Sequence, residues 1–318
     1  MSYRYADTRW MRGSFGVSFH WTAQTVRQAG PPSPWGDAVA DFDPDALADA
    51  LVSVGAKHCI FTLTHALQCL PMPHPLLDRL LPGRTARRDL VGDLAEALRK
   101  RGIRLIAYYN HSCNCHDDPE WERACGYADG PCHDLVKFGE TICGIVRFIA
   151  GRYGDAISAW WFDSGYSVDP TGPVNSVRCD LGAWRFPWLE LNRAAKAGYA
   201  DCAVTFNAGV CRRHLYSECQ DYYAGETTEL FRPFEAEPLP ELTDSRWTAL
   251  DSPQWIFSAK VRDESGLAVA PRFSAAEAAA FLRGNRAAGR MTTFNVLIDR
   301  DGAVNPAALA FLRRVAAE

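Results

Sequence analysis

The sequence predicts an α/β protein that folds as a single (β/α)8 TIM-like barrel over residues 1–318. Short apolar segments alternate with segments of helical periodicity along the whole chain. The apolar segments are continuous, as in parallel strands that are buried on both faces, and no Gly- or Ser-rich linker divides the chain. A length of 318 residues fits eight such units. A doubly wound open sheet is the rival fold, but no GxGxxG motif follows the first apolar segment.

Strands are expected where apolar or aromatic residues run together. The segment near Asp221–Tyr223, which supplies the sixth strand, is the least regular of them. Trp255 to Ser258 is a further strand candidate. Buried runs of this kind favour a sheet covered by helices. The predicted strands are residues 15–20, 58–64, 103–109, 157–162, 202–206, 221–223, 255–258 and 292–298.

Helices are expected between these strands. Asp43 and Pro44 supply an N-cap and a first-turn proline, and Gly55 ends that helix. Ser274 and Glu277 have the spacing of a capping box. The predicted helical segments are residues 44–54, 90–101, 138–149 and 184–197, with further helices that start after Ser274 and Asn305.

The charge and composition exclude several classes of protein. The chain has 34 basic and 38 acidic side chains, and this net charge of −4 argues against a surface for nucleic acid or anionic membrane. It has no run of ~18 apolar residues that would span a membrane, and its first residues lack the apolar core of a secretory signal. Eleven cysteines without such a signal predict free thiols and a cytoplasmic location.

Polar and aromatic side chains follow the predicted strands, at the end where barrel enzymes hold their active sites. Rings stack on the C–H faces of sugars, while imidazoles, amides and carboxylates contact sugar hydroxyls. The sequence therefore predicts a carbohydrate site at this end of the barrel. The residues at these strand ends are His20, Trp21, His65, Tyr109, Asn110, His111, Asp163 and Asn207.

A series of motifs, in order along the chain, resembles the α-L-fucosidase-type retaining glycoside hydrolases of glycoside hydrolase family 29. FGVSFHW at residues 15–21 is similar to FGIFIHWG in that family. The segments at 41–65 and 88–109 resemble FDAxxWAxLAKxAGAKYxxLTxKHH and RDxVxELAxAxRKxGLKxGxYYS. The resemblance spans residues 10–317. It continues in WFDSG at 161–165, similar to the nucleophile segment WFDG, and in DYYAGE at 221–226, similar to the DYxTPE or GNE segment. Residues 288–302 are similar to GGNxLLNxGPxxDG.

The resemblance implies a retaining exo-glycosidase that removes a terminal α-L-fucosyl or related residue by double displacement, without a cofactor or a metal. Such a reaction needs one carboxylate as nucleophile and a second carboxyl as general acid, ~5–5.5 Å apart. Asp163 ends an apolar strand and matches the nucleophile position of the family. Glu226 is the expected acid; sequence spacing leaves Glu218, Glu235 and Glu237 as alternatives.

The other predicted site residues contact the sugar. His20 and His65 share a position after the first two strands, and Trp161 stands two residues before Asp163. The full predicted set of substrate-binding residues is His20, Trp21, Trp35, His65, Tyr109, Trp161 and Asn207. The expected partner is a carbohydrate or glycoside, with no nucleic acid and no membrane, and the oligomeric state stays open.

Departures from the family pattern keep two other functions open. His65-Ala66 replaces a tandem HisHis, and Trp247-Thr248 replaces a Trp-Glu pair, which would suit a sugar-binding barrel with a degenerate site. A C-terminal β-sandwich, common in the family, is not expected. A zinc-dependent barrel hydrolase is the third function, because one loop carries residue types that suit tetrahedral zinc, although their spacing matches no standard finger. That loop contains Cys113, Cys115, His116, Cys125, Cys132 and His133.

Overall fold

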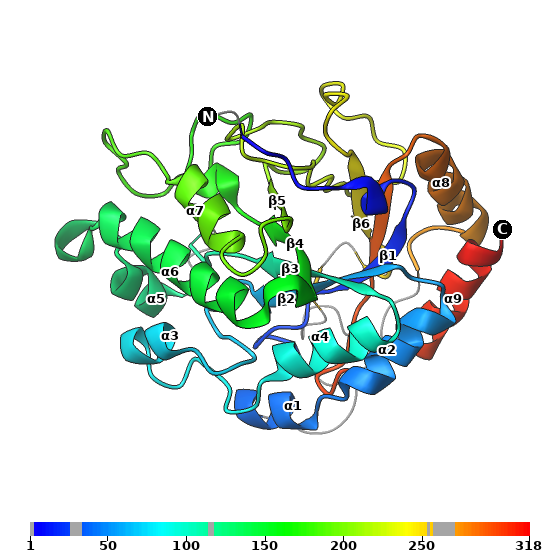
Figure 1. Ribbon diagram of the computed structural model, residues 1–318, viewed down its shortest axis with the longest axis horizontal. Helices are drawn as coiled ribbons and strands as arrows, with labels where there is room; N and C mark the ends of the chain where they lie inside the picture. The colour runs from blue at the N-terminus through cyan, green and yellow to red at the C-terminus, as the bar shows by residue number, and fades with distance from the viewer. Residues whose placement is uncertain (1–2, 26–33, 114–117, 253–254, 257–270) are drawn as a thin grey trace.

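The computed structural model describes residues 3–25, 34–113, 118–252, 255–256 and 271–318. Its centre is a curled sheet of parallel strands in the order β5-β4-β3-β2-β1-β7-β6, with helices around the outside (Figure 1). The strands are β1 (Phe15–Phe19), β2 (His58–Thr64), β3 (Arg104–Tyr109), β4 (Ile157–Phe162), β5 (Ala203–Phe206), β6 (Ser245–Ala249) and β7 (Met291–Asn295).

Helices begin at the predicted capping residues, whereas the segment predicted over 184–197 is helical only over Trp188–Ala195 and the helix predicted over 138–149 begins earlier, at Leu135. Asp43 accepts a hydrogen bond from the Ala46 amide at the start of α2, and both bonds of the Ser274–Glu277 capping box are present in α8. The short helices α1, α3 and α5 were not predicted. The α-helices are α1 (Trp35–Asp41), α2 (Pro44–Ser53), α3 (Pro75–Leu80), α4 (Leu90–Lys100), α5 (Pro119–Cys125), α6 (Leu135–Tyr153), α7 (Trp188–Ala195), α8 (Ala275–Ala287) and α9 (Pro306–Ala317).

The segment 221–227 lies between the two edge strands, β5 and β6. The Asp221 amide donates to the carbonyl of Val204 in β5 (2.8 Å), and the Trp247 amide in β6 donates to the carbonyl of Gly225 (2.8 Å). Gly225 has a φ of +74°, and a Cβ there would lie 2.2 Å from the Ser245 hydroxyl, so this close approach requires glycine. The segment forms only isolated bridges to its neighbours. The ring therefore consists of seven strands and one irregular segment, where the sequence predicted a sixth strand.

One predicted strand is wrong. Trp255 and Ile256, the described part of the 255–258 candidate, form a bend, and the rest of that candidate lies outside the described residues. The strand that follows the 221–227 segment in the chain is β6 (Ser245–Ala249) instead. Arg246 interrupts the apolar pattern of β6, so the sequence did not reveal it. The structure accommodates this guanidinium by pairing it with Asp244 (2.8 Å) and by stacking it over Phe234 (4.0 Å).

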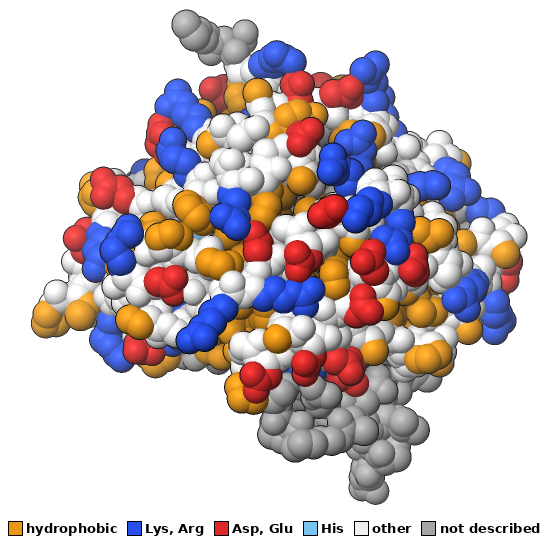
Figure 2. Space-filling view, turned by 60° about the horizontal axis from the view of Figure 1, so that its bottom comes forward, with side chains coloured by type: hydrophobic (Ala, Val, Ile, Leu, Met, Phe, Trp, Pro, Cys, Tyr) orange, Lys and Arg blue, Asp and Glu red, His pale blue; other side chains and the backbone are white. Residues whose placement is uncertain are grey.

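Strand alternation divides the buried side chains into two layers. Tyr108 and Trp161 belong to the cluster inside the barrel, whereas Tyr109 and Trp160 belong to the layer between the sheet and the helices. This follows from the two-residue period of a strand. None of the described helices combines the length and the apolar character needed to cross a membrane. On the described part of the face drawn in Figure 2, acidic and basic side chains are interspersed, so that face carries no extended field of one sign.

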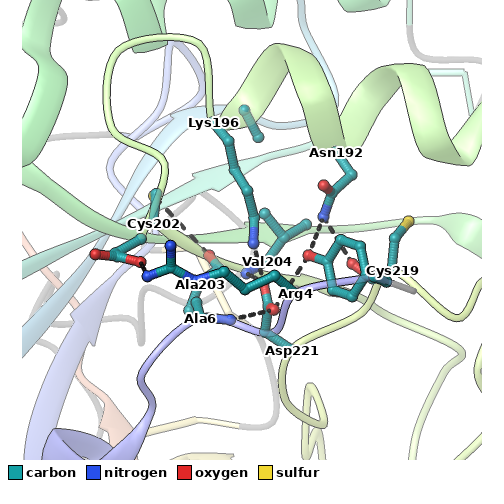
Figure 3. Close-up of polar contacts among 12 residues, drawn as sticks. Arg4, Ala6, Asn192, Lys196, Cys202, Ala203, Val204, Cys219 and Asp221 are labelled. Atoms are coloured by element: carbon teal, nitrogen blue, oxygen red, sulfur yellow. Dashed lines mark hydrogen bonds and ion pairs between the residues drawn. The ribbon is translucent and has the colours of Figure 1, made fainter. Parts of the chain in front are cut away.

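Near its start, the chain is fastened to the segment between β5 and β6 through the buried carboxylate of Asp221. One oxygen accepts bonds from the Ala6 amide (2.8 Å) and the Tyr3 hydroxyl (3.1 Å). The other accepts from the Val204 amide (2.8 Å) and pairs with the Lys196 ammonium (2.9 Å). Figure 3 shows Lys196 and Ala6 converging on Asp221 from different parts of the chain. A single carboxylate thus joins the N-terminal segment, β5 and the end of α7.

Asp221→Ala should lower the free energy of unfolding by ~3–5 kcal/mol, because it leaves a buried ammonium and two buried amides without their acceptor. Urea denaturation followed by tryptophan fluorescence measures this difference. Asp201→Ala is the matched control, since its ion pair with Arg4 is exposed (side chains 44% and 84% accessible) and such pairs contribute ~0–1 kcal/mol. Equal losses in the two variants would contradict the anchoring role of Asp221.

Candidate active site

Inward-facing polar side chains gather where the strands end. They occupy alternate positions that continue the inward face of each strand past its last residue. Because the carboxyl ends of parallel strands meet at the same edge, these side chains contact one another. The group comprises His20 after β1, Tyr108 and Asn110 of β3 and its end, Asp163 after β4, Asn207 after β5, and Asn295 of β7.

Asp163 is held by donors on both carboxylate oxygens. Oδ2 accepts bonds from the Tyr108 hydroxyl (2.5 Å) and the Asn110 amide (3.2 Å). Oδ1 accepts from the Asn207 side-chain amide (2.9 Å) and the Ser164 backbone amide (2.6 Å). Ser164 is buried and adopts a φ of +65°, a conformation that is uncommon for a residue with a side chain and that clusters at functional sites. The carboxylate is therefore fixed in orientation while remaining partly accessible.

Glu226 lies beside Asp163 through one shared partner. The Asn207 side-chain nitrogen donates to Glu226 Oε2 (2.7 Å) as well as to Asp163 Oδ1 (2.9 Å). The separation of the two carboxylate oxygens therefore cannot exceed the sum of these bonds, which is close to the ~5–5.5 Å of retaining glycosidases. Glu226 is placed by the irregular 221–227 segment, whose bridge to Trp247 fixes its backbone.

Burial, and then the neighbouring Asp163 carboxylate, raise the pKa of Glu226 to about 7, although the hydrogen bond from Asn207 acts in the opposite direction. A carboxyl of this kind carries a proton over part of the neutral range, so it can donate one to a departing oxygen. The two carboxyls of the site thus differ in environment. One accepts four hydrogen bonds, and the other is desolvated beside a like charge.

Activity that depends on proton donation by Glu226 should fall as pH rises through about 7. The sign follows from the raised pKa: the protonated, active form predominates below it and is lost above it. A profile of kcat/KM against pH measures this alkaline limb. Glu226→Gln should abolish it, whereas a limb that persists unchanged in that variant would have to come from another group.

Imidazole and indole rings form the wall next to the carboxyl pair. His20 lies 5.4 Å from His65 and stacks on Trp247 at 5.4 Å, while Trp161 stacks on Tyr108 at 5.2 Å (ring centroids). Trp161 is anchored by its indole N–H, which donates to the carbonyl of Ala224 (3.0 Å). The site therefore combines aromatic surfaces with hydrogen-bonding groups, which is typical of sugar-binding pockets.

His20 is neutral and its tautomer is defined. Burial, with His65 nearby, lowers the pKa of His20 to about 3. Nδ1 lies 2.9 Å from Asn295 Oδ1, an atom that only accepts, so Nδ1 carries the hydrogen and Nε2 is left as an acceptor. Asn295 is itself oriented, because its amide nitrogen donates to the carbonyl of Trp255 (2.9 Å). His20 can thus accept a bond from a hydroxyl of a bound ligand.

Several predicted site residues lie elsewhere. Tyr109 faces the helices, where its hydroxyl accepts from Gln68 (2.5 Å), because it is one residue out of phase with the inward Tyr108. Trp21 is out of phase with His20 in the same way and is 1% exposed in the outer layer. Trp35 packs on Trp21 with ring centroids 4.8 Å apart. Of the predicted binding residues, the structure brings together His20, His65, Trp161 and Asn207.

The alternatives to Glu226 lie on the surface. Glu218 and Glu237 are exposed, and Glu235 is exposed and pairs with Arg212. Among the four candidate glutamates, Glu226 alone shares a hydrogen-bond donor with Asp163 among the described residues. The position of the 221–227 segment therefore favours Glu226 over the three alternatives that sequence spacing left open.

The cysteine-rich loop does not assemble a metal site among the described residues, where no three His, Cys, Asp or Glu side chains lie close enough to hold an ion. Cys113 and Cys125 are buried thiols, and Cys132 is exposed. His133 Nδ1 donates a hydrogen bond to the carbonyl of Ala128 in its own loop (3.1 Å). Cys115 and His116 lie outside the described residues.

The sequence analysis missed three residues that build the site, namely Tyr108, Trp247 and Asn295. It named Asn110 at a strand end but did not include it among the substrate-binding residues. The strand period would have selected Tyr108, since it shares the phase of Asn110, and likewise Trp161 shares the phase of Asp163. No comparable signal marked Trp247, because β6 was not recognised as a strand.

Comparisons with known proteins show which family and which folds this chain is similar to. The family model described as Alpha-L-fucosidase matches residues 37–223, more than half of the chain. A search of curated proteins finds no match. Among solved structures, α-L-fucosidase isoenzyme 1 from Paenibacillus thiaminolyticus is similar with a TM-score of 0.67 and 18% identity, over 98% of this chain and 75% of that chain.

Two further structures share the fold. A GH29 α-L-fucosidase from Bacteroides thetaiotaomicron, trapped as a covalent intermediate, gives a TM-score of 0.68 at 14% identity over 100% of this chain and 75% of that chain. The endo-fucoidan hydrolase MfFcnA4 from glycoside hydrolase family 107 gives 0.70 at 16% identity over 98% of this chain. The present chain spans about half of that hydrolase (53%).

Proposed function

Because this chain belongs to the α-L-fucosidase family of glycoside hydrolases, we propose that it removes a terminal α-L-fucosyl or closely related residue from a glycoside with retention of configuration. The observation that carries the proposal is the single Asn207 amide that bonds to both Asp163 and Glu226. Because both carboxylates bond to this one nitrogen, their oxygens lie no further apart than the sum of the two bonds, which supports a double-displacement reaction. Neighbours in fold include both α-L-fucosidases and endo-fucoidan hydrolases, so exo action is part of the proposal.

In the first step, Asp163 attacks the anomeric carbon and forms a glycosyl ester, while Glu226 gives its proton to the departing oxygen. Tyr108 and Asn110 hold Asp163 so that little reorganisation is needed as its charge is lost. In the second step, Glu226, now ionised, removes a proton from water, and the resulting hydroxide displaces the sugar from Asp163. Two inversions at one carbon give net retention.

The wall residues supply orientation in this mechanism. The Nε2 acceptor of His20 and the imidazole of His65 contact hydroxyls of the sugar ring, while the indoles of Trp161 and Trp247 exclude water and contact its apolar face. His65 is followed by Ala66, so one imidazole stands where the family has two, and we propose that this change alters which sugar is preferred.

A panel of 4-nitrophenyl glycosides tests the proposal, with the α-L-fucoside expected to be hydrolysed fastest. Proton NMR of the first-formed sugar should show the α-anomer before mutarotation, which distinguishes retention from inversion. A fucosylated oligosaccharide with both internal and terminal linkages tests exo action, because only terminal fucose should appear. Binding of fucose without turnover of any glycoside would instead favour a sugar-binding barrel, and the β-anomer as first product would contradict double displacement.

A further inference from the structure

A cavity lies at the amino ends of β6 and β7, beside the helix α8. It has a volume of about 290 Å³. Its lining combines arginines with aromatic rings and contains no carboxylate among the described residues. The residues that matter here are Arg232, Phe234, Arg246, Phe281, Asn285 and Arg290. Asp163 follows the end of β4, and Glu226 lies near the end of the 221–227 segment, so this cavity is a separate feature.

Three guanidinium groups share one carboxylate behind this cavity. Asp244 Oδ2 accepts from Arg213 (2.8 Å), Arg246 (2.8 Å) and Arg290 (3.1 Å). Asp244 and the side chains of Arg213 and Arg246 are at most 9% exposed. One negative charge therefore faces three positive charges, which leaves an excess of positive charge; Arg213 and Arg246 are poorly solvated, whereas the side chain of Arg290 is 32% exposed. Burial, together with the repulsion from Arg213 and Arg290, lowers the pKa of Arg246 to about 10.

Donors in the same cavity lack acceptors. The side-chain nitrogen of Asn285, a residue 4% exposed, has no hydrogen-bond partner in the part of the chain that the structure describes. Arg290 uses only Nε on Asp244 among the described residues, so its two terminal nitrogens are available. A buried donor without an acceptor is costly, and a native site of this kind calls for a partner.

We propose that this cavity binds a tetrahedral oxyanion, sulfate or phosphate, either free or as the monoester of a small molecule. The planar guanidinium of Arg290 suits two oxygens of such a group, and the Asn285 amide supplies a third donor. The bound charge balances the excess that Asp244 leaves. Phe234 and Phe281 provide an apolar boundary on which the organic part of an ester would rest.

Isothermal titration calorimetry of the full chain with sodium sulfate and with sodium phosphate tests the proposal. Sodium chloride at equal ionic strength is the reference titration. We expect saturable binding of sulfate or phosphate at one site and none of chloride. Arg290→Gln should weaken binding at least tenfold. Gly284→Leu should also weaken it at least tenfold, because Gly284 lines the cavity and a Cβ there meets no atom within 4 Å, so the added side chain covers the cavity without a clash.

Matched controls separate these effects from general changes. Arg283→Gln removes the same charge from α8 outside the cavity, and Gly151→Leu makes the same change in α6, where a Cβ also meets nothing. Both should bind like the wild type. Titration with glucose 6-phosphate distinguishes the sources: tighter binding than inorganic phosphate supports an ester, and equal binding supports the free ion. The proposal would be overturned if sulfate and phosphate, like chloride, showed no saturable binding. It would also be overturned if both Arg290→Gln and Gly284→Leu bound the anion as tightly as the wild type.

Discussion

Replacing Asp163 by Asn should lower kcat/KM on an aryl α-L-fucoside by at least about a thousandfold, because the amide cannot form the glycosyl ester that the double displacement needs. The fold should survive. Asn has the shape of Asp, and the Tyr108 hydroxyl, which donates to Asp163, can rotate and accept a bond from the new amide. Initial rates at several substrate concentrations, with thermal unfolding of both proteins, measure the two expectations.

Asp169→Asn is the matched control for this variant. Asp169 lies on the loop that follows β4, and its carboxylate accepts hydrogen bonds from Thr171 and from the Trp188 indole. The same chemical change there should leave turnover within a few fold of the wild type. Near-normal turnover of Asp163→Asn, with the protein free of contaminating hydrolase, would remove Asp163 from the proposed reaction.

Glu226→Gln should slow the hydrolysis of glycosides with poor leaving groups by about a hundredfold or more, and that of 4-nitrophenyl glycosides much less. The difference arises because nitrophenolate departs without a proton, whereas an alkoxide does not. The second step also loses its base, so the glycosyl-enzyme should accumulate. Azide should then restore turnover and yield a glycosyl azide of retained configuration, since it attacks the ester without deprotonation.

Glu229→Gln serves as the control. Glu229 lies only three residues after Glu226, but it is exposed and pairs with Arg272. The rate of the Glu229→Gln variant should show the same dependence on the leaving group as the wild type, and azide should not increase it. If Glu226→Gln lost activity equally on every leaving group and azide had no effect, the acid role would belong to another residue, and the exposed Glu218, Glu235 and Glu237 would be the next to replace.

The general architecture was accessible from the sequence because it rests on local signals. Apolar runs marked six of the seven strands, and capping residues such as Asp43 and Ser274 marked helix starts that the structure confirms. The strand β6 was not predicted, because Arg246 interrupts its apolar pattern. This arginine is stabilised by residues distant in sequence: it stacks on Phe234, and it shares Asp244 with Arg213. Propensity cannot foresee a charge that tertiary contacts neutralise.

The candidate site was predicted less evenly. Asp163 and His20 stand at strand ends in the inward phase, so position alone placed them correctly. Tyr109 and Trp21 were chosen for their residue type, but each is one residue out of phase and its side chain turns toward the helices. The hydrogen bond from Asn207 to Glu226 could not be predicted from the sequence, because it depends on how the irregular 221–227 segment packs on two strands.

The pairing of β1 with β7 has a consequence for biosynthesis. His20 is oriented by Asn295, which is 275 residues further along the chain, and the register of β1 with β7 runs from Phe15 with Thr292 to Ser18 with Asn295. A ribosome must therefore release almost the whole polypeptide before the ring can close and the imidazole can take its place. Until then one edge of β1 is unpaired, so nascent chains can aggregate or bind chaperones. Truncated translation products that lack β7 should be inactive even though they contain Asp163 and Glu226.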